Sequence, residues 1–118
     1  EGDRHLFREA VDEYKRLRPF LPGQRFLLTG PLHQDWEIWQ FVHPSEEAFA
    51  LLAFREGGQI SGVRVEMCVP AQDRSYLIQR SGADGVVTVS GVELASDGIM
   101  LCLPEQRSSD VIWVTAAP

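Results

Sequence analysis

The sequence contains no asparagine and only two cysteines, and both scarcities narrow the classes of protein to which it can belong. Without asparagine the chain has no N-glycosylation acceptor. Cys68 and Cys102 each stand in an apolar, strand-like segment, which predicts two buried thiols; a disulfide remains open if the two strands are neighbours. Nothing in this cysteine usage indicates an oxidising compartment, so we expect a cytoplasmic protein.

Long apolar runs and an excess of basic charge are missing as well. No run reaches the ~18 apolar residues that a membrane-spanning helix needs, and the charged N-terminal stretch is unlike a signal peptide. Seventeen acidic residues against eleven lysines and arginines give a net charge of −6, which repels nucleic acid and anionic lipid. The basic stretch YKRLR at 14–18 suits the C-terminal end of a solvated helix better than a nucleic-acid patch. We therefore expect neither nucleic acid nor a membrane as a partner.

A length of 118 residues indicates a single domain, and its first part predicts one amphipathic helix over 3–18. Asp3 fits the N-cap position. The segment RPFLPG ends the helix, because Pro19 disfavours helix at the preceding residue and Pro22 with Gly23 is a turn signal. The apolar residues that recur at three- and four-residue spacing are Leu6, Phe7, Ala10, Val11, Tyr14 and Leu17.

After Gly23 the hydrophobic period changes from 3.6 to 2, which is typical of strands. Short sequential strands separated by turn residues predict an all-β fold. We expect an antiparallel β-sandwich of about eight strands, of Greek-key type, preceded by one N-terminal α-helix. The predicted strands are 24–30, 35–43, 47–56, 60–69, 75–80, 85–91, 98–104 and 110–116.

The predicted helix has no obvious partner inside the chain. We therefore divide the chain into a terminal helix and linker over 1–22, which belong with a preceding domain, and a β-sandwich domain over 23–118. The chain also starts at Glu1 without an initiating methionine. Both features lead us to interpret it as part of a longer protein.

No arrangement of residues predicts catalysis or metal binding. Nucleophilic catalysis needs a serine or cysteine beside a base, and both cysteines lie in strand interiors. Two histidines and two carboxylates in the segment 33–43 share strand parity, but zinc sites have tighter ligand spacing and a loop breaks the register, so surface polar residues are the favoured interpretation. These four residues are His33, Asp35, Glu37 and His43. We predict no catalytic, substrate-binding or metal-binding residue, and no cofactor.

The stretch DWEIWQF holds two of the three tryptophans. On a strand, Trp36 and Trp39 point to opposite faces. A platform for a sugar ring keeps its aromatic rings on one face, so we place one of the two in the core. The other is predicted at an interface with another domain, with the edge of the core and sugar stacking as alternatives. Trp113 has apolar neighbours on both faces and is predicted to be buried.

The order of several segments carries a family resemblance. The helix end EYKRLRPFL leads into FLLTG and DWEIWQFV, and the tail reads SYLIQRSGADGVVTVSGVELASDGIMLCLP. In this order the chain resembles the C-terminal region of bacterial α-galactosidases of glycoside hydrolase family 36. The positions that match the family's tail pattern are Tyr76, Ile78, Gly85, Val89, Ser90, Gly91, Leu94, Gly98, Ile99, Leu101, Leu103 and Ser109.

The resemblance implies a division of labour between this chain and the rest of a parent enzyme. Its partner would be the catalytic (β/α)8 barrel of the same parent chain, which the segment 23–118 braces, and the parent would also form a homo-oligomer. The parent would be a retaining hydrolase of terminal α-galactosides such as melibiose or raffinose. Its two catalytic aspartates belong to the barrel, so no residue of this chain inherits a catalytic role. A free-standing carbohydrate-binding or protein-interaction β-sandwich module is the alternative.

Overall fold

The computed structural model describes residues 12, 14–30, 35–68, 71–80 and 85–118. Eight strands in this described part confirm the predicted all-β fold. They are β1 (Arg25–Leu27), β2 (Trp36–Val42), β3 (Ala48–Arg55), β4 (Gly62–Val65), β5 (Ser75–Arg80), β6 (Val87–Ser90), β7 (Ile99–Cys102) and β8 (Ser108–Ala116). The described elements also include the 3-10 helix η1 (Arg18–Phe20) before β1 and the helix α2 (Gly91–Ser96) between β6 and β7.

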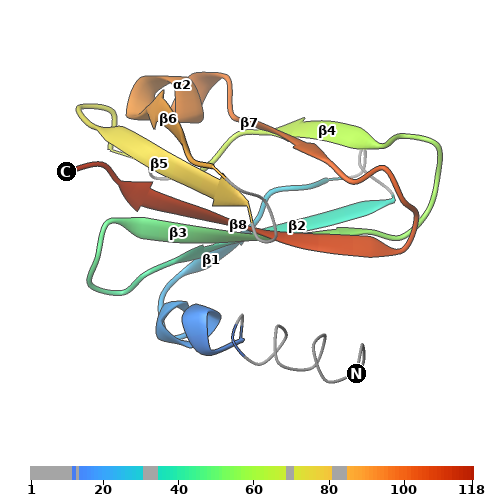
Figure 1. Ribbon diagram of the computed structural model, residues 1–118, viewed down its shortest axis with the longest axis horizontal. Helices are drawn as coiled ribbons and strands as arrows, with labels where there is room; N and C mark the ends of the chain where they lie inside the picture. Colours follow the sequence, from blue (N-terminus) through green and yellow to red (C-terminus); the bar gives the residue numbers. More distant parts are fainter. Residues whose placement is uncertain (1–11, 13, 31–34, 69–70, 81–84) are drawn as a thin grey trace.

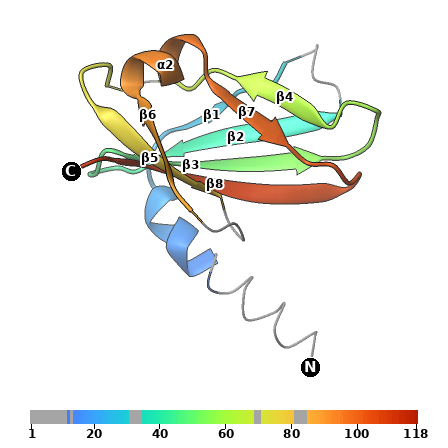
Figure 2. The same ribbon diagram turned by 45° about the horizontal axis from the view of Figure 1, so that its top comes forward.

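The strands form two antiparallel sheets that lie in separate layers (Figure 1). Six strands make the larger sheet in the order β1-β2-β3-β8-β5-β6, and β4 pairs with β7 in the smaller one. Figure 2 shows β4, β7 and α2 on one face of the larger sheet and the N-terminal helical segment on the opposite face. We call these the inner face and the outer face of the six-stranded sheet.

The main core lies between the inner face and the β4–β7 layer. Alternate residues of each strand point into it, as the period of two predicts. In β3 this inward set includes Phe49 and Leu51, and β4 contributes Val63 and Val65, all of them buried. A row of buried apolar side chains from both layers excludes water and stabilises the stack.

The prediction of one strand over 85–91 is wrong at its end, around Ser90. The structure instead has β6 followed directly by α2. The Ser90 hydroxyl accepts the backbone N–H of Glu93 at 3.2 Å, which caps the new helix. Leu94 is fully buried, and its side chain packs in the main core and so holds this helix against it. A cap and one buried anchor suffice for a six-residue helix, although such a helix is too short to show a helical period.

The predicted helix over 3–18 can be compared with the structure only over its C-terminal part. Residues 12 and 14–17 are helical, Arg18 begins the 3-10 helix η1, and residues 3–11 and 13 lie outside the described residues. The helical segment does have a partner in this chain, because Leu17 and Phe20 pack on the outer face. No helix in the described part is long and apolar enough to cross a membrane.

Candidate functional site

The outer face of the six-stranded sheet carries a second apolar cluster, separate from the core. The Phe20 ring centroid lies 5.8 Å from that of Trp113 and 5.2 Å from that of His43. The guanidinium carbon of Arg16 lies 4.1 Å from the Trp113 ring centroid, a cation–π contact. These contacts attach the helical segment to the sheet. We call this the outer-face cluster; its buried members are Phe20, Phe41, Ala48, Ala50 and Trp113, with Leu17, Trp39, Leu52 and Val111 partly buried around them.

Apolar side chains continue across the outer face in a line. Leu27 is 49% exposed, and Phe54, on the same face of β3, is 40% exposed. A contiguous apolar surface of this kind marks a contact with another domain or protein more often than a solvated face. We call this line the apolar row. Strand pairing places four of its residues side by side on β1, β2, β3 and β8, and Phe54 lies two residues further along β3. The row consists of Leu27, Trp39, Leu52, Val111 and Phe54.

The two tryptophans of β2 point to opposite faces of the sheet, as strand parity predicts. Trp36 is buried in the core, where its indole Nε1 donates a hydrogen bond to the carbonyl oxygen of Ile60 at 3.0 Å. Trp39 is half-buried on the outer face. Trp113 is buried, as predicted, under the helical segment on the outer face. Trp36 and Trp39 therefore do not form a common platform for a sugar ring.

The histidines and carboxylates of the segment 33–43 do not gather at one place. His33 lies outside the described residues, and Asp35 and Glu37 are exposed. The Nδ1 atom of His43 accepts two backbone N–H groups of the turn that follows, at 3.1 and 3.0 Å. Within the described ranges, no group of three or more His, Cys, Asp or Glu side chains is placed to hold a metal ion.

The two cysteines differ from their prediction. Both thiols are free, Cys68 is only half-buried, and Cys102 is exposed, so the prediction of two buried thiols is wrong. Cys102 ends β7 on the face opposite to the buried Leu101. An apolar run predicts a strand, but parity decides which of its residues face solvent.

Buried polar side chains connect the two layers. Gln40 is fully buried, its amide Nε2 donates to the carbonyl oxygen of Cys68 at 2.7 Å, and its Oε1 accepts the N–H of Cys68 at 2.7 Å. This pair of bonds replaces a strand partner for the segment after β4. Arg55, also buried, donates to the carbonyl oxygens of Leu103 and Gly58 at 2.7 and 2.8 Å. Both side chains thus satisfy backbone groups of distant segments with hydrogen bonds from the interior of the fold.

Tyr76 joins three segments of the chain at one hydroxyl group. It donates to Glu47 Oε1 and accepts the backbone N–H of Ala71, each at 2.7 Å. Burial of the ring, together with the hydrogen bond to Glu47, raises the pKa of Tyr76 to about 12. The hydroxyl therefore stays protonated at neutral pH and acts as a structural donor.

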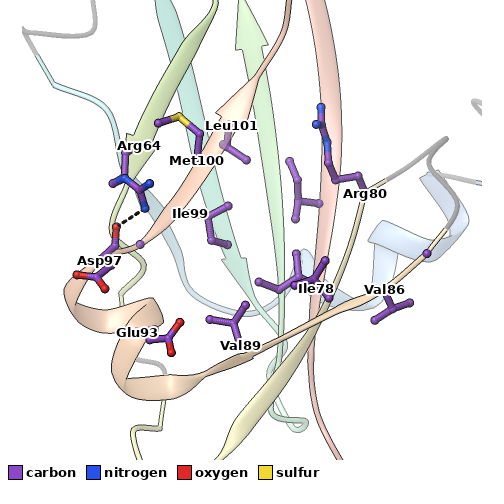
Figure 3. Close-up of a pocket in the computed structure, with 14 residues that line it drawn as sticks. Arg64, Ile78, Arg80, Val86, Val89, Glu93, Asp97, Ile99, Met100 and Leu101 are labelled. Carbon is purple, nitrogen blue, oxygen red and sulfur yellow. Dashed lines mark hydrogen bonds between the residues drawn. The ribbon is translucent and has the colours of Figure 1, made fainter.

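A groove of about 570 Å³ opens between β6 and β7 (Figure 3). Its volume falls in the range of ligand-binding clefts. Arg64, Glu93 and Asp97 lie along one side, and Arg80 lies on the other. None of the described residues that line the groove is aromatic, so it is unlike a sugar-stacking site. The lining is mainly aliphatic and includes Ile78, Val87, Val89, Ile99, Leu101 and Ile112.

The groove was not predicted from the sequence. It arises where β6 and β7 remain unpaired with each other, and strand pairing cannot be read from a single strand. The signal that was present is the stretch GVVT at 85–88, where two consecutive valines leave one apolar side chain facing solvent whichever way the strand turns.

The residues that carry the family resemblance lie mostly in the core and at tight contacts. Tyr76, Leu94 and Leu101 are buried. A side chain at Gly91 would collide with a backbone carbonyl oxygen, and Gly98 combines such a collision with a φ of +74°, which favours glycine. These matching positions therefore describe how β5, β6, α2 and β7 pack.

Comparisons with known proteins agree with that packing pattern at the level of fold. No protein-family model matches the chain, and no curated protein matches its sequence. The galactosidase domain of the α-galactosidase-sucrose kinase AgaSK is similar to it, with a TM-score of 0.81 and 21% identity over 99% of this chain and 16% of that one. The glycoside hydrolase family 36 α-galactosidases AgaA and AgaB from Geobacillus stearothermophilus give TM-scores of 0.80 and 0.74, each at 20% identity and with the same coverage.

The fold is therefore that of one small portion of family 36 α-galactosidases, which confirms the resemblance seen in the sequence. The chain spans about a sixth of the length of these enzymes. That coverage is consistent with one domain of a larger enzyme.

Proposed function

We propose that this chain is a non-catalytic β-domain of an α-galactosidase-like glycoside hydrolase and braces the catalytic (β/α)8 barrel of its parent. The parent hydrolyses terminal α-galactosides. The observation that carries the proposal is the fold match over 99% of this chain but 16% of an α-galactosidase chain. The apolar row supplies a surface on which a neighbouring domain can rest.

The helical segment indicates where that neighbour lies. It is attached to the outer face through Phe20, Trp113 and Arg16, on the same face as the apolar row. A domain on this side of the sheet would share the outer face with the helical segment and could cover Leu27 and Trp39. Covering a half-exposed apolar side chain contributes about 1 kcal/mol, so the row would add several kcal/mol to the contact.

Catalysis is assigned to the absent barrel and to no residue of this chain. A glycosidase flanks the scissile bond with two carboxyl groups from opposite sides. The two carboxylates of the groove, Glu93 and Asp97, both belong to the α2 side. We place the protein in the cytoplasm, which is supported by the free thiols of Cys68 and Cys102.

Three measurements on the chain and its gene test the proposal. The purified chain is expected neither to hydrolyse a chromogenic α-galactoside nor to bind raffinose in a calorimetric titration. Turnover would disprove the non-catalytic role, and saturable raffinose binding would favour a carbohydrate-binding module. The gene upstream of the codon for Glu1 is expected to encode a (β/α)8 barrel with two catalytic aspartates. Its absence would reject the bracing role.

A matched pair of variants tests the bracing surface itself. Leu27→Ser changes the apolar row, and Ile60→Ser changes a side chain of similar exposure, 59% against 49%, in the loop between β3 and β4. In the isolated chain both variants are expected to leave the Tm nearly unchanged. In the full-length parent, only Leu27→Ser should accelerate heat inactivation of the α-galactosidase activity. Equal effects of the two variants would remove the apolar row from the contact.

A further inference from the structure

The groove is bordered by two strands that each lack a neighbour on one side. In the described sheets β6 is the last strand of the larger sheet, and β7 pairs only with β4. An edge strand presents a row of unpaired N–H and C=O groups that can accept another strand. Figure 1 shows β6 leading into α2 and β7 leading away from it, so α2 connects the two strands. The groove thus combines backbone hydrogen-bonding groups with an aliphatic interior.

The apolar side of β6 is left open to solvent at its start. Val87 pairs with Ile78 and shares the inward face with Val89, yet its side chain is 64% exposed. Val86 and Met100, which also line the groove, are 53% and 50% exposed. Val87 is thus an inward-facing aliphatic side chain without a cover, and together with Val86 and Met100 it leaves an apolar surface exposed at this edge.

The α2 side of the groove is acidic. Glu93 and Asp97 line the groove, and Glu66 borders the adjoining cleft with Asp97. Arg64 is the single cation on this side among the described lining residues, and its Nη1 donates to the backbone oxygen of Asp97 at 3.2 Å. Across the groove, Arg80 is paired with a carboxylate at 2.7 Å. The excess of negative charge selects an occupant that carries positive charge.

We propose that the groove binds an extended segment of a partner polypeptide, which adds to β6 as a further strand. Its aliphatic side chains alternate into the groove, and a lysine or arginine lies beside Glu93 and Asp97. Strand addition of this kind obtains its affinity from backbone hydrogen bonds and its selectivity from pockets for alternate side chains. A second copy of this chain is disfavoured, because each copy has a net charge of −6 and would bring its own acidic surface to the contact.

A short synthetic peptide tests the proposal with the whole 118-residue chain. The probe is the fluorescein-labelled peptide Lys-Thr-Val-Thr-Ile-Thr-Lys-Ser, in which the two lysines and the two aliphatic residues share one face of an extended strand, and its binding is followed by fluorescence anisotropy. The same peptide with proline in place of isoleucine cannot complete the strand, so it is expected to bind at least about tenfold more weakly. Hydrogen exchange should become slower in Val87–Ser90 when the first peptide binds.

Two matched variants locate the binding surface. Val87→Gln removes an exposed apolar side chain inside the groove, and Val92→Gln removes one on α2 that is 52% exposed and does not line the groove. The first is expected to weaken binding about tenfold, since it places a polar group against the peptide's aliphatic side chains. The second should leave binding unchanged. Because both positions are exposed, neither change threatens folding.

The charge contribution is tested separately. Glu93→Gln is expected to weaken binding of the lysine peptide about threefold and to leave unchanged a peptide with glutamine at both lysine positions. Glu37→Gln, an exposed control on the outer face, should affect neither peptide. The proposal is overturned by absence of saturable binding, by equal effects of the Val87 and Val92 variants, or by sedimentation showing that the groove is already closed by a second copy. None of these outcomes bears on the α-galactosidase assignment.

Discussion

Replacing the buried Gln40 by leucine measures how strongly one side-chain amide holds the two layers together. Both hydrogen bonds of this amide go to the backbone of Cys68, 28 residues further along the chain, at 2.7 Å. Leucine has a similar size but offers neither donor nor acceptor. Gln40→Leu therefore leaves a backbone N–H and a C=O without partners.

The size of the effect follows from burial. A buried polar group left unsatisfied costs about 1–3 kcal/mol. Cys68 is half-buried, so water can replace part of the loss and the lower end of that range applies to each group. The two groups together cost about 2 kcal/mol, and the apolar side chain returns about 1 kcal/mol, so the free energy of unfolding should fall by about 1 kcal/mol. The Tm of a chain of this size should fall by about 4 °C.

Urea unfolding followed by circular dichroism supplies the measurement. Gln72→Leu is the matched control, since this exposed glutamine makes no side-chain hydrogen bond in the structure, and its effect should stay within about 0.5 kcal/mol. Hydrogen exchange adds a local readout: the amide of Cys68 should lose protection in Gln40→Leu more than the amides of β3 do. Equal stability of the two variants would refute the assignment of Gln40 as a link between layers.

The Gln40→Glu variant gives a second signature through pH. A protonated glutamic acid can donate to the Cys68 carbonyl oxygen, whereas the ionised form cannot. Burial raises the pKa of the introduced carboxyl group in the folded state above its unfolded value of about 4.3. The variant therefore keeps its stability below the unfolded-state pKa of about 4.3 and loses it as the pH rises through the higher folded-state pKa. A variant whose stability relative to the native chain does not change between pH 4 and 8 would contradict this placement.

Three further changes extend the test to other parts of the fold. Tyr76→Phe should lower the free energy of unfolding by about 2 kcal/mol. Because the pKa of Tyr76 is raised from 10.0 to about 12, the native chain should lose stability as the pH rises from 10 towards 12, and the variant should lack this loss in a pH series of thermal melts. Gly91→Ala should cost about 3 kcal/mol through its collision with backbone, while Gly57→Ala, with open space around it, should be neutral or slightly stabilising in urea unfolding. Trp113→Ala should cost about 3–5 kcal/mol and Trp39→Ala about 1 kcal/mol, since only the first indole is buried; equal losses would show that the helical segment does not cover the outer face.

Much of the candidate contact surface followed from parity, and the groove did not. Alternation along β2 set Trp36 and Trp39 on opposite faces without any knowledge of neighbouring strands. The apolar row, by contrast, exists only because β1, β2, β3 and β8 lie in register. The residues of β8 come more than fifty positions after those of β3, and no local pattern specifies that pairing.

The sequence by itself determined most of the strands, the end of the α-helix just before Pro19, where a 3-10 turn follows, and the resemblance to family 36, because these depend on neighbouring residues and on their order. Tertiary structure decided the partner of Gln40, the exposure of Cys102, and the short helix that follows Ser90. It also decided that β6 and β7 leave a groove between them. Each of these depends on which distant segments pack together, since burial is a property of the assembled layers and not of any one stretch of chain.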